Sequence, residues 1–439
     1  MGKIVPRTLP GFMELLPNEQ IRFNYFLDKI KKSYESFGFL PLDTPTIEHA
    51  EVLLAKTGGE TEKQVYEFTK GDSHLVLRYD LTVPLAKYVS LYKSNLSFPF
   101  KRYQIGKVFR GERAQKGRFR EFYQCDIDII GENTLDIFYD AEVLSAINST
   151  FNNIGFTDFI IKINNRKILK GIFEFLNINE KSTEILRIID KKDKIGQEKI
   201  VEELSSIGIL DDNINKLIDF MSFSGSNDEK IDLLNKMNIS NKMFEEGVHE
   251  LEKVINYIRM SEVPEESFII DQTIARGLDY YTGTVYETFL NQHKEIGSIC
   301  SGGRYDDLAE CYTDAKLPGV GISIGLTRLF SQVNKLSTFD NLRQTTVDVV
   351  VIPLVEAKKA CLSLTTFLRK NGINTDIMPF DSKKLKNKFK YVSKTKVKLA
   401  LIIGEEELKT NKYTIKNLET GEQQSLSSEE LVRSIKNCS

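Results

Sequence analysis

One stretch of the chain, residues 109–128, combines charge and strand pattern in a way that few folds can accommodate. It begins with Arg110 at the end of an apolar, strand-like run, passes through a basic loop that contains glycine, and returns as an alternating strand ending in carboxylates. A hairpin of this kind has cations at its mouth and acids along its returning arm. It can hold a polyphosphate at one end and a cationic group at the other.

The composition narrows the class of protein. A chain of 439 residues is too long for one ordinary core, so we expect two or three domains. Lys and Arg number 60 against 62 Asp and Glu, so any nucleic-acid surface must be a local patch. The five cysteines contain no CxxC pair, which fits a reducing compartment and argues against a zinc site or a disulfide framework. We see no signal peptide and no apolar run of membrane-spanning length, and we expect a cytoplasmic protein.

The spacing of apolar residues predicts an α+β organisation. A helix is expected at about 81–94, within a set of short strands whose connections favour antiparallel pairing. Residues 165–262 show helical periodicity throughout and predict a helical insert, although they could be more of the same core. Residues 267–276 and 283–290 look like a second hairpin. After about 345, strands alternate with helices, which is typical of a small domain with a mainly parallel sheet.

The glycine-rich run Gly319–Gly325 does not identify a nucleotide loop. Its spacing is G-x-G-x-x-x-G inside a strand-like segment, and no P-loop pattern occurs anywhere in the chain. The glycines could let a ligand lie against the strand, or they could serve close packing alone.

Five elements in order resemble the histidyl-tRNA synthetase family. Residues 38–48, with Pro45, are similar to motif 1 of class II aminoacyl-tRNA synthetases. Arg110–Asp128 and Gly319–Arg328 are similar to motifs 2 and 3. Arg276–Tyr281 and Ser301–Asp306 are similar to two signatures specific to that family.

The resemblance implies a fold and its divisions. It implies a class II synthetase core, which is an antiparallel sheet flanked by helices, interrupted by a helical insertion and followed by an α/β anticodon-binding domain. The expected boundaries are 1–164 and 263–336 for the two parts of the core, 165–262 for the insertion and 346–439 for the anticodon-binding domain.

For the ATP end of the site, the resemblance implies a set of cations. Fixed cations are needed because attack of a carboxylate on the α-phosphate concentrates negative charge in the transition state. Arg110 and Arg276 are the expected catalytic residues. The residues implied for ATP binding are Arg110, Glu112, Phe122 and Arg328, with adenine expected between Arg328 and Phe122.

For the amino-acid end, the resemblance implies six histidine-binding residues. An α-ammonium requires several acceptors together, and each nitrogen of the imidazole ring requires a partner. Asp80, Thr82 and Gln124 are implied for the amine; Asp128, Tyr281 and Tyr305 are implied for the ring.

Two details qualify this set. Asp80 and Asp128 stand where many bacterial members have Glu, and the pattern is similar to the eukaryote-like variant of motif 2. Tyr280 and Tyr281 are adjacent, so on a strand they would point to opposite faces and only Tyr281 is expected in the pocket.

Transfer RNA is the expected macromolecular partner. Residues 383–398 contain eight lysines and no acid, with aromatic residues interleaved; this run predicts an RNA surface or a solvated helix face. The loop residues Gln115, Lys116 and Arg118 are implied to contact the acceptor end of tRNA-His.

The expected activity is that of a histidine–tRNA ligase, using L-histidine and ATP with Mg²⁺ and acting as a homodimer. The sequence does not identify metal ligands. The alternatives are a non-catalytic regulatory paralogue, an RNA-binding sensor of uncharged tRNA and a class IIa synthetase for another amino acid; the signature Arg276–Tyr281 argues against the last.

Overall fold

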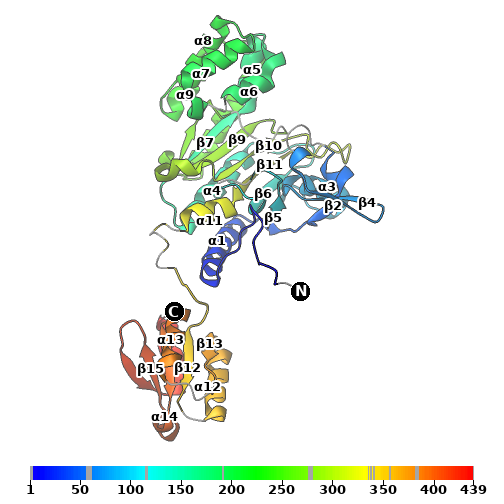
Figure 1. Cartoon of the computed structure of the whole chain (residues 1–439). Helices are drawn as coiled ribbons and strands as arrows, with labels where there is room; N and C mark the ends of the chain where they lie inside the picture. Colours follow the sequence, from blue (N-terminus) through cyan, green and yellow to red (C-terminus); the bar gives the residue numbers. More distant parts are fainter. Residues whose placement is uncertain are drawn as a thin grey trace. The chain divides into compact units, whose positions relative to one another are not determined.

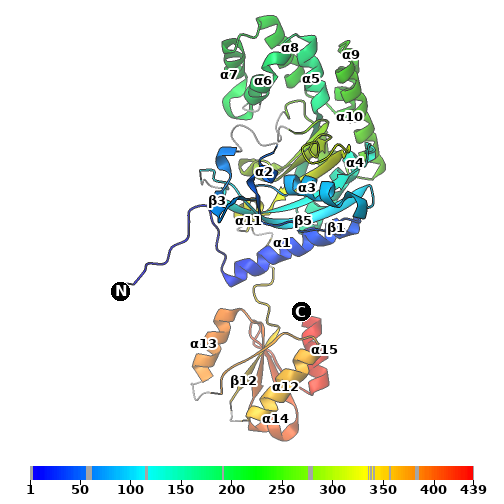
Figure 2. The same ribbon diagram turned by 90° about the vertical axis from the view of Figure 1, so that its right-hand side faces the viewer.

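The computed structural model describes residues 3–55, 62–113, 117–189, 192–274, 280–334, 336, 339, 342–354, 357–380 and 385–438. The chain forms two compact units (Figures 1 and 2). One comprises residues 1–14 and 26–335, and the other comprises residues 15–25 and 336–439. Among the described residues, no helix combines the length and the apolar character needed to cross a bilayer.

The larger unit is built around one sheet with the order β1-β5-β6-β11-β10-β9-β7-β8. Its inner neighbours pair antiparallel, and the two outermost pairs, β1 with β5 and β7 with β8, are parallel. The predicted antiparallel core is therefore confirmed, with a parallel strand added at each edge. The strands are β1 (Leu40–Pro41), β5 (Phe100–Phe109), β6 (Glu121–Ile130), β7 (Phe159–Asn165), β8 (Phe268–Ile270), β9 (Thr284–Leu290), β10 (Cys300–Tyr305) and β11 (Gly319–Gly325).

The hairpin predicted around residues 109–128 is formed by β5 and β6. The two strands pair along their full length, with Arg102 opposite Asp128 and Gln104 opposite Asp126. Successive side chains of a strand point to opposite faces. Cys125, Ile127 and Ile129 are wholly buried on one face, and the polar residues between them lie on the other.

The second predicted hairpin is wrong. Strands β8 and β9 do not pair with each other, because β7 lies between them. Strand β7 pairs antiparallel with β9 and parallel with β8. Its alternate residues Ile161 and Ile163 are wholly buried. The strand beside β9 is therefore β7, from about 120 residues earlier in the chain, and not β8, which the hairpin prediction had placed there.

Helices α4 (Phe138–Ile154) and α11 (Leu326–Val333) lie beside this sheet, together with residues 26–36 of α1 (Pro17–Ser36), the part of that helix that belongs to this unit. Helices α4 and α11 pack against β6, and the rings of Phe26 and Phe330 meet edge to face at 5.6 Å. A small three-stranded sheet, with the order β2-β4-β3, precedes the hairpin. Its elements and neighbours are β2 (Ile47–His49), α2 (Ala50–Leu53), β3 (Glu67–Lys70), β4 (Ser73–Leu77) and α3 (Thr82–Tyr92).

Helices α5 to α10 follow β7 in the described chain; α5 to α9 lie together beyond that strand (Figure 1), and α10 packs against both α5 and α4. Their bounds are α5 (Arg166–Phe175), α6 (Ser182–Ile189), α7 (Lys192–Ser206), α8 (Asp211–Ser222), α9 (Asn227–Lys236) and α10 (Lys242–Met260). Helices α5 and α10 approach closely at two glycines. A Cβ added at Gly171 would lie 2.6 Å from Phe244, and one at Gly247 would lie 2.8 Å from the Ile168 nitrogen.

The second unit contains a five-stranded sheet with the order β13-β12-β14-β15-β16. Strand β12 pairs parallel with β13 and β14, and the later strands pair antiparallel. The predicted mainly parallel α/β arrangement therefore holds for its first three strands. The elements are β12 (Val349–Pro353), α12 (Lys358–Lys370), β13 (Thr375–Ile377), α13 (Leu385–Thr395), β14 (Leu399–Ile403), α14 (Glu405–Thr410), β15 (Tyr413–Asn417), β16 (Gln423–Leu426) and α15 (Ser428–Cys438).

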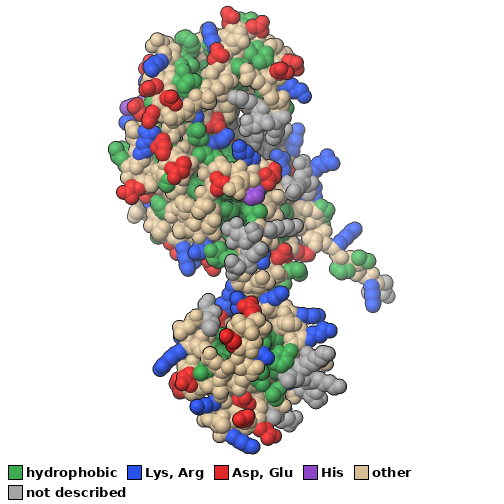
Figure 3. Space-filling view, turned by 90° about the vertical axis from the view of Figure 1, so that its left-hand side faces the viewer, with side chains coloured by type: hydrophobic (Ala, Val, Ile, Leu, Met, Phe, Trp, Pro, Cys, Tyr) green, Lys and Arg blue, Asp and Glu red, His purple; other side chains and the backbone are tan. Residues whose placement is uncertain are grey.

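The lysine run of this unit is not a uniform surface. Lys388 is buried, and its Nζ donates to the carbonyls of Pro353 and Pro379 at 3.0 and 3.2 Å. Phe389 packs against the core, whereas Tyr391 is exposed. Lysines remain exposed at 390, 394, 396 and 398. On the face shown in Figure 3, the basic side chains of this unit are interspersed with acidic ones.

The contact between α5 and α10 generates a stability prediction. Gly171→Ala should lower the free energy of unfolding by about 1–3 kcal/mol, because the methyl group would overpack against Phe244. Alanine at an unobstructed helix position would instead stabilise by about 1 kcal/mol. The measurement is the melting temperature, with the exposed Lys170→Ala on the same helix as the control. A Gly171→Ala protein as stable as the wild type would contradict the close approach.

Candidate active site

A cavity of about 420 Å³ opens over the polar face of β6. Every predicted site residue that the structure describes lies on its wall, although these residues come from distant parts of the chain. They are Asp80, Thr82, Arg110, Glu112, Arg118, Phe122, Gln124, Asp128, Tyr281, Tyr305 and Arg328. Arg276, Gln115 and Lys116 lie outside the described residues.

An ion pair between Arg102 and Asp128 lies beneath the cavity. The Arg102 Nη2 is 2.7 Å from Asp128 Oδ2, and both side chains are almost completely buried. The same guanidinium donates to the Leu81 carbonyl at 2.9 Å, and the Tyr305 hydroxyl donates to Asp128 Oδ1 at 2.5 Å. Burial raises the pKa of Asp128 to about 6, against the opposing effects of Arg102 and Tyr305. Asp128 is therefore an ionised acceptor at neutral pH.

Asp80 lies at the start of α3 and faces the same cavity. Its Oδ1 accepts a hydrogen bond from the Val83 nitrogen at 3.1 Å, and its Oδ2 has no hydrogen-bond partner among the described residues. Burial raises the pKa of Asp80 to about 6, while the Val83 N–H and the nearby Arg110 lower it. The helix thus fixes one carboxylate oxygen and leaves the other for a ligand.

Gln124 and Asp126 are connected through Ser323 on the neighbouring strand β11. The Gln124 amide donates to the Ser323 hydroxyl at 2.7 Å, and Ser323 also hydrogen-bonds to the Asp126 carboxyl. Asp126 is 1% exposed. Burial, together with the charges of Asp128 and Asp80, raises the pKa of Asp126 to about 8, although Arg102 and Ser323 act in the opposite direction.

Both adjacent tyrosines line the cavity, which corrects the expectation that only Tyr281 would do so. Residues 280 and 281 are not in a strand, so the alternation of strand side chains does not apply to them. Their rings meet edge to face with centroids 5.0 Å apart, and Tyr280 also contacts the Tyr305 ring at 5.9 Å. The Tyr280 hydroxyl hydrogen-bonds with Thr82 and Tyr281.

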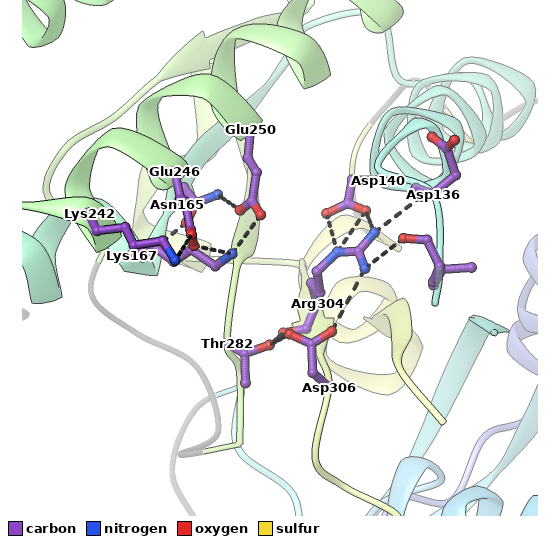
Figure 4. A network of polar contacts seen from close by, with 11 residues as sticks. Asp136, Asp140, Asn165, Lys167, Lys242, Glu246, Glu250, Thr282, Arg304 and Asp306 are labelled. Carbon is purple, nitrogen blue, oxygen red and sulfur yellow. Dashed lines mark hydrogen bonds and ion pairs between the residues drawn. The ribbon is translucent and has the colours of Figure 1, made fainter. Parts of the chain in front are cut away.

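Side chains behind the cavity hold this tyrosine cluster in place. Arg166, the first residue of α5, donates to the Tyr281 carbonyl at 3.1 Å. Figure 4 shows Arg304, which precedes Tyr305, directed at the carboxylate of Asp140. Arg304 also donates to the carbonyls of Leu135 and Asp136 at 3.2 Å. The buried pair of Arg304 and Asp140 therefore anchors the end of β10.

The basic end of the cavity contains Arg110, Arg118 and Arg328. The Arg110 Nε donates to the Tyr79 carbonyl at 3.0 Å, and its guanidinium lies over the Phe122 ring at 5.3 Å. Arg328 donates to the Ile296 carbonyl. Arg118 is largely exposed and lies 3.4 Å from the Glu112 carboxylate. The placement of adenine between Arg328 and Phe122 stays a prediction.

Two glycines of β11 make room for site side chains. A Cβ at Gly321 would lie 2.2 Å from Asp128 Oδ1, and one at Gly319 would lie 2.3 Å from the Tyr305 ring. The glycine-rich run was interpreted either as a place for a ligand or as close packing. These two glycines serve close packing, and the side chains that pack against them, Asp128 and Tyr305, line the cavity.

Sequence reasoning missed Arg102, Asp126 and Ser323. The alternation of polar and apolar residues over 124–128 contained the signal for Asp126, because Gln124, Asp126 and Asp128 must share one face of a strand. Arg102 and Ser323 become recognisable only from the strand register, which places them opposite Asp128 and Asp126.

The described residues include no candidate metal site formed by protein side chains alone. Within the ranges that the structure describes, no three His, Cys, Asp or Glu side chains are grouped as a cation site.

The raised pKa of Asp126 predicts how stability depends on pH. The folded protein retains this proton up to about pH 8, whereas an unfolded chain loses it near the ordinary aspartate pKa of 3.8. The contribution to stability is complete below the unfolded pKa and is lost as pH rises to about 8, by up to about 1.4 kcal/mol per pH unit. Asp126→Asn should therefore become more stable relative to wild type between pH 5 and about 8, with a constant difference above that. Melting temperatures measured across this range check it; a difference independent of pH would contradict a buried protonated carboxyl.

Comparison with known proteins identifies the family of the chain. Residues 11–329 match the family model described as "Histidyl-tRNA synthetase", and residues 348–437 match "Anticodon binding domain". A relative from Clostridium tetani called "Histidine--tRNA ligase" is 54% identical over 99% of both chains. The crystal structure of histidyl-tRNA synthetase from Nostoc sp. is 40% identical, covers 100% of both chains and has a TM-score of 0.92.

A further solved structure shares the fold alone. It is described as an ATP phosphoribosyltransferase regulatory subunit/histidyl-tRNA synthetase from Bacillus halodurans, and it is 19% identical. It covers 92% of this chain and 100% of its own, with a TM-score of 0.76. The family model spans most of this chain and the C. tetani relative matches it nearly end to end. The chain therefore belongs to the histidyl-tRNA synthetase family.

Proposed function

We infer that this chain is an aminoacyl-tRNA synthetase that joins L-histidine to tRNA-His at the expense of ATP. The observation that carries the inference is one cavity with arginines at one end and buried carboxylates at the other. An enzyme that activates an amino acid must bind a polyphosphate and an ammonium side by side, and this cavity offers both environments.

The reaction has two steps. The histidine carboxylate attacks the α-phosphorus of ATP, pyrophosphate leaves, and histidyl-adenylate forms. A hydroxyl of the terminal ribose of tRNA then attacks the acyl carbon, and AMP leaves. Arg110 and Arg276 are the proposed catalytic residues, because guanidinium groups stabilise the charge that develops on the α-phosphate. Glu112, Phe122 and Arg328 are proposed to complete the ATP site.

The acidic end selects the amino acid. Asp80, Thr82 and Gln124 are proposed to bind the α-ammonium, while Asp128 and Tyr281 bind the two ring nitrogens and Tyr305 closes the pocket. The bond from Tyr305 to Asp128 and the ion pair with Arg102 support this assignment, because they fix the Asp128 carboxylate as an acceptor. An apolar analogue would leave these buried groups unpaired, which disfavours it strongly.

Magnesium is proposed to arrive with ATP. It typically keeps several waters and binds through substrate phosphates with one or two carboxylates. Its chemistry would be charge neutralisation on the phosphates, and Glu112, which lines the cavity, is the carboxylate of the predicted ATP set.

The tRNA is proposed to meet both units. Gln115, Lys116 and Arg118 would contact its acceptor end, and the family match of residues 348–437 supports anticodon binding by the second unit. The domain boundaries predicted above, a homodimer and a cytoplasmic location complete the proposal. The exposed apolar side chains of Leu40 and Ile47, within the segment that resembles motif 1, support the dimer.

The regulatory paralogue is the alternative function. The 54% identical relative called "Histidine--tRNA ligase" favours the synthetase, and so does the retention of all described site residues around one cavity.

Amino-acid-dependent exchange of pyrophosphate into ATP tests the proposal. With each of the twenty standard amino acids supplied in turn, histidine alone should support exchange. Exchange with a different amino acid, or with none, would refute the proposed activity.

Arg276→Ala tests the second catalytic arginine. Adenylate formation should fall by about a hundredfold or more, since the variant lacks a fixed positive charge that stabilises the transition state. The melting temperature should change little. Arg187→Ala, an exposed arginine of α6, is the matched control. A folded Arg276→Ala enzyme with nearly the full rate would remove this residue from the chemistry.

A further inference from the structure

Four buried acceptor atoms on the cavity wall have no hydrogen-bond partner among the described residues; one of them, Asp128 Oδ2, is ion-paired with Arg102 at 2.7 Å, and the other three have no ion pair among those residues either. These three are Asp80 Oδ2, Gln124 Oε1 and Asp126 Oδ1. A buried polar atom without a partner costs free energy, so such a group is normally satisfied by water or a ligand. An α-ammonium has three N–H donors. The number and kind of free acceptors therefore match a primary ammonium, and the third of them, Asp126, is absent from the amine-binding set proposed above.

The strand geometry places Asp126 where it can take part. Gln124 and Asp126 are alternate residues of β6 and share its polar face, with their backbone positions roughly 6.6–6.8 Å apart along the strand. Ser323 accepts from the Gln124 amide and hydrogen-bonds to Asp126. This bridge orients the Gln124 amide nitrogen toward β11, so its oxygen and Asp126 Oδ1 remain for the cavity.

At the described floor of the cavity, ionisation of all three buried aspartates would leave more negative than positive charge. Asp80, Asp126 and Asp128 are all buried there. Arg102 is fully buried and ion-paired with Asp128, and Arg110 is near Asp80. Asp126 has no cation of its own, so in the ligand-free cavity it is the carboxyl that retains a proton. The charged or titratable groups that interact electrostatically with Asp126 are Asp80, Asp128, Arg102, Tyr34, Tyr281, Cys125 and Cys300.

We propose that Asp126 is the third acceptor for the α-ammonium of histidine and that it releases its proton when the amino acid binds. The O–H bond of the carboxyl breaks, the proton passes to solvent, and the new carboxylate accepts one ammonium N–H. This proposal rests on the proposed function, because it takes histidine as the substrate. It adds a specific prediction: recognition of the amine is coupled to the ionisation of one buried acid.

The pH range for a test is set by the neighbours. Burial raises the pKa of Asp80 and Asp128 to about 6, below that of Asp126 at about 8. The pKa values of Cys125, Cys300, Tyr34 and Tyr281 are all raised by burial. Between pH 7 and 8, therefore, Asp126 is the one of these groups whose ionisation changes most.

Titration calorimetry of the full chain at pH 7 measures the released proton. Histidine is titrated in two buffers of different ionisation enthalpy, since the difference in heat reports the number of protons exchanged. Wild type should release close to one proton per histidine bound, beyond the small contribution of the ligand's own ring, and Asp126→Asn should lack this release. Equal proton release by both proteins, or none by wild type, would overturn the proposal.

Two ligand analogues make the test independent of any variant. Histidinol keeps the ammonium and the ring but lacks the carboxylate, whereas imidazolepropionate keeps the ring and the carboxylate but lacks the ammonium. Histidinol should release the proton from wild type and imidazolepropionate should not. Release with imidazolepropionate, or none with histidinol, would place the coupling elsewhere than at the amine.

The kinetic counterpart is the KM for histidine in pyrophosphate exchange. At pH 8, Asp126→Asn should raise this KM by about tenfold or more with the KM for ATP unchanged. Towards pH 6.5 the ratio of the Asp126→Asn KM to the wild-type KM should fall by up to about tenfold per pH unit. The reason is that the wild-type protein must then ionise Asp126 before histidine binds. A ratio that does not change with pH would indicate a purely structural role and overturn the proposal. A wild-type protein that binds no histidine would instead refute the proposed function.

Discussion

The buried ion pair between Arg102 and Asp128 is the contact on which the site depends. It joins β5 to β6 at one register position, and it brings the Leu81 carbonyl and the Tyr305 hydroxyl to the same two side chains. This ion pair thereby fixes the start of α3 through Arg102 and the end of β10 through Asp128. Removing one partner of such a pair leaves an uncompensated buried charge and typically costs about 3–5 kcal/mol. The geometry of the floor is consequently tied to the stability of the sheet.

The same floor shows why a polar pocket can be specific. From residue 124 to residue 129 of β6, the even-numbered residues are polar and lie on the cavity wall, while the odd-numbered residues are apolar and lie on the opposite face. Water is excluded from the apolar face of the strand. On the polar face, water can enter the cavity until a substrate replaces it. A low-dielectric surround strengthens each interaction with a ligand and penalises each unpaired group, so a substrate that leaves one acceptor empty binds much more weakly.

The sequence allowed much of this to be predicted, for reasons that differ by residue. The hairpin and the shared face of Gln124 and Asp128 follow from strand periodicity, and the family signatures brought Asp80, Tyr305 and Arg328 into one set. The insertion of β7 between β8 and β9 could not be predicted, because no local pattern encodes which distant strand fills a gap in a sheet. Arg102 was missed for the same reason: its role comes from a cross-strand neighbour. Lys388 was counted in the exposed lysine run, but it is buried. The charge of such a run does not reveal which lysine will hydrogen-bond to backbone carbonyl groups in the interior.

The glycines of β11 have a consequence for anyone who wishes to reprogramme the substrate. A single methyl group at Gly321 or Gly319 would enter space already filled by Asp128 or Tyr305. New selectivity cannot be introduced by adding side chains on that wall without displacing the groups that define the pocket. Libraries aimed at a different amino acid should therefore vary the β6 face and residues 280 and 281, and keep these two glycines constant.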